Sequence, residues 1–154
     1  MLTPDGHVIQ DSIEILDHLE ARFPELPAFP ETPRQRTFVH LMELMGSEGL
    51  VGLAWRHRWL FEENLDFVRA DFGRSFRPQG SNEELHKYGS LIADRMMSYG
   101  LPATSESLRA DLNQQFLAVL QLFENHLQHH PYFVGGHPSA ADYAVMGAMH
   151  AHLG

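Results

Sequence analysis

The groups that could do chemistry in this chain are hydroxyls, carboxylates, imidazoles and guanidinium groups, because the sequence contains no cysteine. The chain therefore offers no thiolate nucleophile, no disulfide and no Cys-type zinc site. Two acid and hydroxyl pairs stand out: Asp11 next to Ser12, and Ser139 three residues before Asp142. Asp and Ser are among the commonest residues that cap helix N-termini, so spacing alone favours a cap at both places.

The eleven histidines raise the possibility of a metal site. His126 and His130 stand four residues apart, which would put two imidazoles on one face of a helix. No HExxH motif or similarly spaced carboxylate accompanies them, and Pro131 indicates that the helix is already ending. We interpret them as surface histidines and predict no bound metal, with a helical metalloprotein as the weaker alternative.

The segment WRHRW, residues 55–59, places two tryptophans one helical turn apart. It could line a small-molecule pocket, with an arginine pairing to an anionic group. The simpler interpretation, which we favour, buries the aromatic rings and lets the arginines reach solvent. The methionines, Met42 and Met45 among them, are likewise interpreted as adaptable core filler.

Composition narrows the class of protein. With 154 residues, 44% hydrophobic and 20% charged, the chain can form the core of one domain or slightly more. The formal charge of −9, with eleven scattered Lys and Arg, argues against a nucleic-acid partner. No apolar run is long enough to span a membrane, and the N-terminus lacks a signal-peptide pattern. We therefore predict a cytoplasmic protein with no membrane partner.

The element around which the rest must be organised is a helix that begins after Ser139. The Ser139 hydroxyl is expected to accept the Asp142 backbone N–H, while the Asp142 carboxylate accepts the Ser139 N–H. From 140 to 151 the sequence is apolar on nearly every side of a helix, so we expect other elements to enclose it.

The chain opens with a Pro-Asp-Gly turn and a short strand at 7–9, followed by a helix that Asp11 and Glu14 begin and that stops before Pro24. Prolines at every third position from 24 to 33 favour an extended, polyproline-like connector. Apolar spacing then predicts a bundle of helices, weakened by glycines at 46, 49 and 52 and interrupted by a loop at 74–81. These helices cover about 34–45, 54–61, 62–72, 82–99 and 105–129.

Taken together, these features resemble a glutathione S-transferase. The likeness is carried by PDG-x-V-I, the Asp11-Ser12 helix start, the helix end LE-x-x-FP, the Pro-rich connector and YFVGGHPSAADYAVMGAMHAHL at 132–153. It is strongest at 6–24 and 132–153. The resemblance implies a mostly α fold: 1–24 would be the last strand and helix of a thioredoxin-like glutathione-binding domain, 25–33 a linker, and 34–154 an all-α C-terminal domain.

The same resemblance implies a substrate site. Ser12 and the helix N-terminus would receive the γ-glutamyl carboxylate of glutathione, as bare N–H groups and a hydroxyl can, and Asp11 would contact its amino group. An apolar electrophile would lie near Met42, Met45 and Trp55. Ser139 and Asp142 match the family's structural cap.

The resemblance also implies that the intact protein adds the glutathione thiol to an electrophile and forms a homodimer. The family's thiol-activating residue and its glutathione-binding cis-proline have no counterpart here and would lie before Met1, and family members continue beyond the last helix. We therefore expect the chain to be part of a longer protein, and its catalytic residue stays unassigned. A non-catalytic binding or assembly module of the same shape is the alternative.

Overall fold

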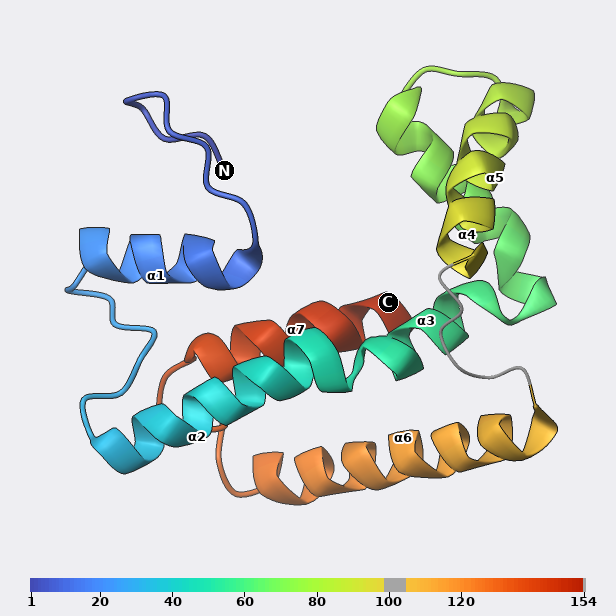
Figure 1. Cartoon of the computed structure of the whole chain (residues 1–154). Coiled ribbons are helices and arrows are strands. Elements are labelled where there is room, and N and C mark those ends of the chain that lie inside the picture. The colour runs from blue at the N-terminus through green and yellow to red at the C-terminus, as the bar shows by residue number, and fades with distance from the viewer. Residues whose placement is uncertain (99–104, 154) are drawn as a thin grey trace. The chain divides into compact units, whose positions relative to one another are not determined.

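Helices make up most of the chain (Figure 1) in the computed structural model, which describes residues 1–98 and 105–153, the side chains of 151–153 excepted. The elements are α1 (Ser12–Arg22), α2 (Pro33–Leu44), a π-helical segment η1 (Met45–Gly49), α3 (Val51–Trp59), α4 (Glu62–Phe76), α5 (Asn82–Ser98), α6 (Glu106–Leu127) and α7 (Ala140–Leu153). Within the described residues, β pairing is limited to isolated bridges. The prediction of a mostly α fold is confirmed.

The chain divides into two compact units. Unit 1 consists of Met1–Gly49 and Leu120–Ala148, and unit 2 consists of Leu50–Val119 and Met149–Gly154. Helices α6 and α7 therefore each contribute residues to both units. The domain division expected at 25–33 stays a prediction.

Unit 1 begins with a tight hairpin. Leu2 and Val8 form an antiparallel bridge, and the Thr3 backbone N–H donates to the His7 carbonyl at 2.9 Å. Gly6 closes the turn with a φ of +87°, a conformation that glycine adopts at little steric cost. The strand expected at 7–9 is present only as this bridge.

The connector between α1 and α2 folds back on α1. The Glu20 carboxylate accepts the backbone N–H groups of Ala28 at 2.8 Å and Phe29 at 3.3 Å, and the Phe29 side chain is buried. A further turn joins the Leu26 N–H to the Phe23 carbonyl at 3.1 Å. The expectation of an extended connector is therefore wrong, because one carboxylate of α1 fixes two of its amides.

Helix α7 is covered on one side only. Ala140, Ala141 and Val145 are buried, whereas Tyr143 and Met146 are 49% and 59% exposed. The expectation that other elements enclose this helix is wrong for these residues. An apolar composition permits burial on every side, but it does not supply the neighbouring elements that would cover each face.

A glycine contact brings η1 against α7 within unit 1. A Cβ at Gly46 would lie 2.6 Å from the Ala144 carbonyl oxygen, so only a residue without a side chain fits there. Gly46 was expected to weaken or end the preceding helix, and α2 does end at Leu44, after which the backbone continues through Gly46 as the π-helical segment. A glycine is needed at position 46 because the backbones of η1 and α7 approach closely there.

The main feature of unit 2 is a helical hairpin of α4 and α5, which lie against each other (Figure 1). Gly73 and Gly89 allow this contact: a Cβ at Gly73 would lie 2.1 Å from the Leu85 carbonyl oxygen. We expected α4 to end at Gly73, with a loop from 74, but the helix continues to Phe76. Trp59, Val68 and Ala93 form the buried cluster beside the hairpin.

The start of α5 carries a reciprocal cap. The Ser81 N–H donates to the Glu84 carboxylate at 2.9 Å, and the Glu84 N–H donates to the Ser81 hydroxyl at 3.3 Å. The expected ends of α5 at Tyr99 and of the following loop at Thr104 lie outside the described residues.

No helix in the described part of the chain has both the length and the apolar character that crossing a membrane requires.

Candidate functional site

The N-terminus of α1 presents a carboxylate and a hydroxyl side by side. Asp11 is the N-cap, and its Oδ1 accepts the Ile13 backbone N–H at 2.9 Å. Both Asp11 and Ser12 are exposed. Within the described residues no hydrogen bond occupies the Ser12 hydroxyl or the backbone N–H groups of Ser12 and Glu14. The second Asp11 oxygen is likewise left available.

The backbone of Asp11 is strained. Its φ of 78° and ψ of 141° lie near a region that is essentially restricted to glycine, and it is the one described non-glycine residue with positive φ. Such strain costs on the order of 1–3 kcal/mol and gathers at sites where the surrounding structure fixes a functional geometry. The sequence gives no sign of this conformation.

These groups complement a zwitterionic amino-acid head group. A free carboxylate can accept from an ammonium group, while bare N–H groups, a hydroxyl and the positive end of the helix dipole can donate to a carboxylate. Because Asp11 and Ser12 are adjacent, both halves of such a head group can be bound at one helix start. Their assignment to glutathione stays a prediction.

The second acid and hydroxyl pair lies at the start of α7. The Asp142 carboxylate accepts the Ser139 backbone N–H at 2.8 Å, as expected. The Ser139 hydroxyl does not accept the Asp142 N–H: it donates to the same carboxylate at 2.8 Å, and the Asp142 N–H goes to the Ser139 carbonyl at 3.0 Å. The other Asp142 oxygen accepts the Phe133 N–H at 3.0 Å, a contact that sequence spacing does not reveal.

The three residues expected near the electrophile belong to different units. Met42 is buried and Met45 half-buried in unit 1, whereas Trp55 is half-buried in unit 2, packed on the Trp59 cluster. Neither cavity described below is lined by any of the three. An electrophile pocket formed by them stays a prediction.

A buried carboxylate lies next to Met42. Glu43 is only 3% exposed, and one of its oxygens lies 2.8 Å from the His40 Nδ1. The other oxygen, Oε1, has no hydrogen-bond partner among the described residues. Burial of Glu43 has no signal in the sequence, since an acidic residue in an amphipathic helix is normally assigned to the solvent side.

The segment at 55–59 departs from the simpler interpretation in one respect. Trp59 is buried, as expected, but so is Arg56, at 7% exposed. The Arg56 guanidinium donates through Nε to the Asn113 side chain at 3.0 Å and lies over the Phe61 ring at 5.1 Å. The expectation that the arginines reach solvent is therefore wrong for Arg56, because α6 supplies it with a hydrogen-bond acceptor inside unit 2.

The histidine pair at the end of α6 is also more structured than expected. His126 is half-buried, its ring lies parallel to that of Phe133 with centroids 5.8 Å apart, and its centroid lies 4.9 Å from that of His130. Among the described residues no group of three or more His, Asp or Glu side chains could hold a metal ion. His130 is an exposed surface histidine, as expected, whereas His126 is half-buried by its ring contacts.

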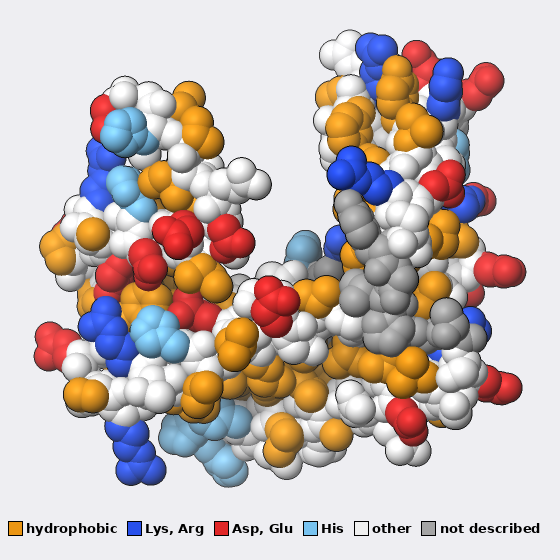
Figure 2. All heavy atoms as spheres, in the orientation of Figure 1, with side chains coloured by type: hydrophobic (Ala, Val, Ile, Leu, Met, Phe, Trp, Pro, Cys, Tyr) orange, Lys and Arg blue, Asp and Glu red, His pale blue; other side chains and the backbone are white. Residues whose placement is uncertain are grey.

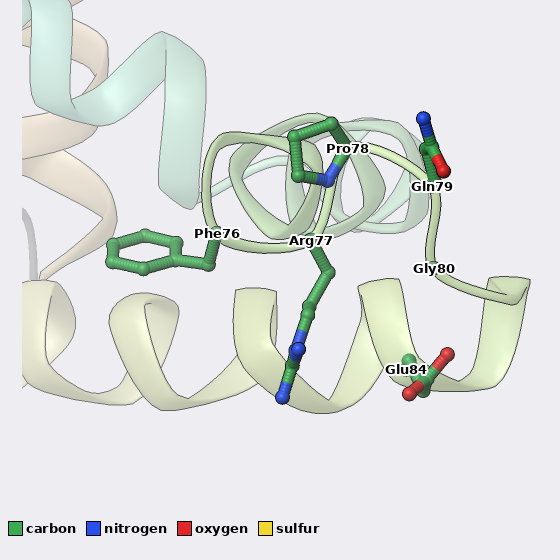
Figure 3. Close-up of a pocket in the computed structure, with 6 residues that line it drawn as sticks. All are labelled: Phe76, Arg77, Pro78, Gln79, Gly80 and Glu84. Carbon is green, nitrogen blue, oxygen red and sulfur yellow. The ribbon is translucent and has the colours of Figure 1, made fainter.

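A shallow cavity of about 450 Å³ lies at the loop between α4 and α5 (Figure 3). Arg77 reaches across α5, where its guanidinium donates to the Tyr88 hydroxyl at 3.2 Å. This hydrogen bond raises the pKa of Arg77 above its ordinary value. Hydrogen bonding to the Ser81 backbone lowers the pKa of Glu84, which also lines the cavity. With its cation and its carboxylate both engaged, the loop presents no convergent reactive groups.

Comparison with known proteins gives two matches. Residues 86–153 match the family described as "Glutathione S-transferase, C-terminal domain". A protein of Caenorhabditis elegans named "Probable maleylacetoacetate isomerase" is 28% identical over 97 residues, which is 63% of this chain and 44% of that relative. The chain therefore spans less than half the length of the curated relative that it matches. No solved structure matches the chain.

The helical fold and the capped helix α7 are consistent with an all-α domain of the glutathione S-transferase C-terminal type, the class that the matched region 86–153 indicates. Over these residues the chain is similar to the C-terminal domain of glutathione S-transferases.

Proposed function

We propose that this protein binds glutathione at the N-terminus of α1 and adds the glutathione thiol to an electrophilic small molecule. The observation that carries the proposal is the pairing of a free carboxylate oxygen at Asp11 with an unoccupied hydroxyl and bare N–H groups at Ser12. The similarity of residues 86–153 to the glutathione S-transferase C-terminal domain supports glutathione as the ligand of this helix start.

In this proposal Ser12 and the first-turn amides hold the γ-glutamyl carboxylate, and the second oxygen of Asp11 accepts from the amino group. The thiol loses its proton and its sulfur forms a bond to the electrophilic carbon, while a leaving group such as a halide departs with its electron pair or, in an addition, a π bond of the electrophile opens and takes up a proton. The base that takes this proton is unassigned. The apolar part of the electrophile would contact Met42, Met45 and Trp55, and the protein would act in the cytoplasm as a homodimer.

A second candidate reaction comes from the Caenorhabditis elegans relative, whose name describes an isomerase acting on maleylacetoacetate. Isomerisation of an unsaturated acid of that type is compatible with the same glutathione site. Assays of the protein with maleylacetoacetate and with a simple aryl halide, each with and without glutathione, distinguish isomerisation from conjugation. Glutathione binding without turnover of either substrate would favour the non-catalytic module.

Isothermal titration with glutathione tests the site itself. We expect saturable binding, weakened about tenfold by Ser12→Ala through loss of a hydrogen bond to a charged group. Asp11→Asn should weaken binding similarly, because the amide keeps the cap but loses the charge that attracts an ammonium group. Ser75→Ala is the matched control, since Ser75 is an exposed helical serine of α4. Absence of binding at millimolar glutathione, or equal effects of Ser12→Ala and Ser75→Ala, would contradict the proposal.

A further inference from the structure

Unit 1 contains a cavity of about 450 Å³ whose lining is cationic and aromatic. Its walls come from three elements: the first turns of α2, the end of α6 and the loop before α7. Six of the lining residues carry the argument: Arg34, Gln35, Phe38, His126, His130 and Phe133. Figure 2 shows histidine side chains gathered on the surface near the C-terminal end of α6.

The wall formed by His126 is held in place by its neighbours. The His126 Nε2 lies 3.3 Å from the Tyr132 carbonyl oxygen, and its ring lies parallel to that of Phe133. Phe133 is fixed in turn by an edge-on contact with Phe123, at 5.0 Å between centroids, and by its N–H bond to Asp142. This wall of the cavity therefore has a defined position, which reduces the entropy that its side chains lose when a ligand binds.

The charge of the lining is unusual for this protein. The chain carries a formal charge of −9, yet none of the residues that line this cavity is Asp or Glu. Arg34 contributes a permanent cation with a planar fork of donors, and His130 contributes a ring N–H that can donate, whereas the His126 Nε2–H is directed to the Tyr132 carbonyl. An anion that enters the cavity meets donors and no competing carboxylate in its walls, whereas a metal cation would be repelled by Arg34.

The remaining walls are apolar. Phe38 and Phe133 provide aromatic surface, and the volume lies in the range of small-molecule sites, in which a largely apolar wall carries a few convergent polar groups. We propose that this cavity binds a small organic anion in which a carboxylate or sulfonate is attached to an aromatic ring system. The site shares no residue with the proposed glutathione site at Asp11 and Ser12.

Titration with naphthoate and with its neutral analogue naphthamide tests the proposal. Naphthoate should bind saturably, and naphthamide at least about tenfold more weakly, because it cannot form charge-assisted hydrogen bonds with Arg34. Arg34→Gln should weaken naphthoate binding by a similar factor. Arg36→Gln is the matched control: it removes the same charge from the same helix, but Arg36 lies over the Phe29 ring and does not line the cavity.

Histidine side-chain NMR locates the ligand independently of any variant. Naphthoate should shift the ring signals of His126 and His130 and leave those of His7 and His57 unmoved. Ser12→Ala should leave the naphthoate affinity unchanged. The experiment therefore distinguishes an incorrect proposal for this cavity from an incorrect proposal for the glutathione site. Equal binding of acid and amide, equal effects of Arg34→Gln and Arg36→Gln, or unmoved His126 and His130 signals at saturation would overturn the proposal.

Discussion

A single oxygen of Asp142 accepts two hydrogen bonds from Ser139, one from its backbone N–H and one from its hydroxyl, each 2.8 Å long. The other oxygen of Asp142 accepts the Phe133 N–H at 3.0 Å, and Ser139 is fully buried. The carboxylate therefore does most of the capping at the start of α7, and it also ties the preceding loop to the helix. The Ser139 hydroxyl is a donor in this arrangement.

Replacing Asp142 should therefore cost more than replacing Ser139. Asp142→Ala leaves three donors without an acceptor and should lower the free energy of unfolding by about 3 kcal/mol. Ser139→Ala removes one of the three bonds and should cost about 1 kcal/mol. Urea denaturation of both variants measures the difference. An ordinary cap, in which the serine is the main acceptor, would give the reverse order.

The contact between α4 and α5 predicts a large effect at Gly89. A Cβ at this position would lie 1.8 Å from the Arg69 carbonyl oxygen, which belongs to the backbone and cannot rotate away. Gly89→Ala should thus destabilise the protein by about 3 kcal/mol or more, although alanine is the better helix former. Gly52→Ala is the control, because a Cβ there meets nothing within 4 Å and should stabilise α3 by up to about 1 kcal/mol. Thermal unfolding of the pair compares the two; a neutral Gly89→Ala would exclude the close contact.

The helices could be predicted from the sequence because their signals are local. Apolar spacing, proline positions and capping residues place most helix ends within a few residues of those observed, and the N-cap at Asp11 is seen directly in its bond to Ile13. Glycines were harder to interpret. Gly73 does not end α4, and Gly46 lies in the π-helical segment that follows α2; each lets a backbone from another helix approach, and that contact is not visible in the local sequence.

The candidate sites were only partly predictable for the same reason. The Asp11-Ser12 pair is visible in the sequence, since cap chemistry needs only neighbouring residues. Burial of Arg56 depends on Asn113, which lies on α6, and the cavity at Arg34 depends on the end of α6 as well. Most charged residues of an amphipathic helix are exposed, and the sequence does not show which of them will be buried. The strained backbone conformation of Asp11 likewise cannot be predicted from the sequence.

That strain predicts an unusual order of stabilities at Asp11. Glycine adopts positive φ freely, whereas alanine both loses the cap and adds steric strain, so Asp11→Gly should be more stable than Asp11→Ala by about 2 kcal/mol. The N-cap Ser81 is the matched position, because the structure records no positive φ there. The difference in the free energy of unfolding between Ser81→Gly and Ser81→Ala should be about 1 kcal/mol smaller than the difference between the two Asp11 variants. Equal differences at the two caps, measured by urea denaturation, would show that Asp11 is unstrained.

The environment of His57 predicts a loss of stability in mild acid. Burial and, to a smaller extent, the neighbouring Arg56 charge hold the pKa of His57 below its ordinary value of 6.5. Its ring lies 4.6 Å from that of Phe116 and 5.5 Å from that of Phe61, between centroids, so a charged imidazole is poorly solvated there. The unfolded chain therefore takes up a proton at a higher pH than the folded chain does.

The sign of the effect follows from this difference. Well above pH 6.5 the residue is neutral in both states and contributes no pH dependence. As the pH falls below 6.5 the unfolded state is protonated first, so stability declines until the folded pKa is passed and then levels off. Urea denaturation from pH 8 to pH 5 should show a smaller decline for His57→Gln than for the wild type. His129→Gln, which changes an exposed histidine, should retain the wild-type decline; equal profiles for all three proteins would contradict the lowered pKa of His57.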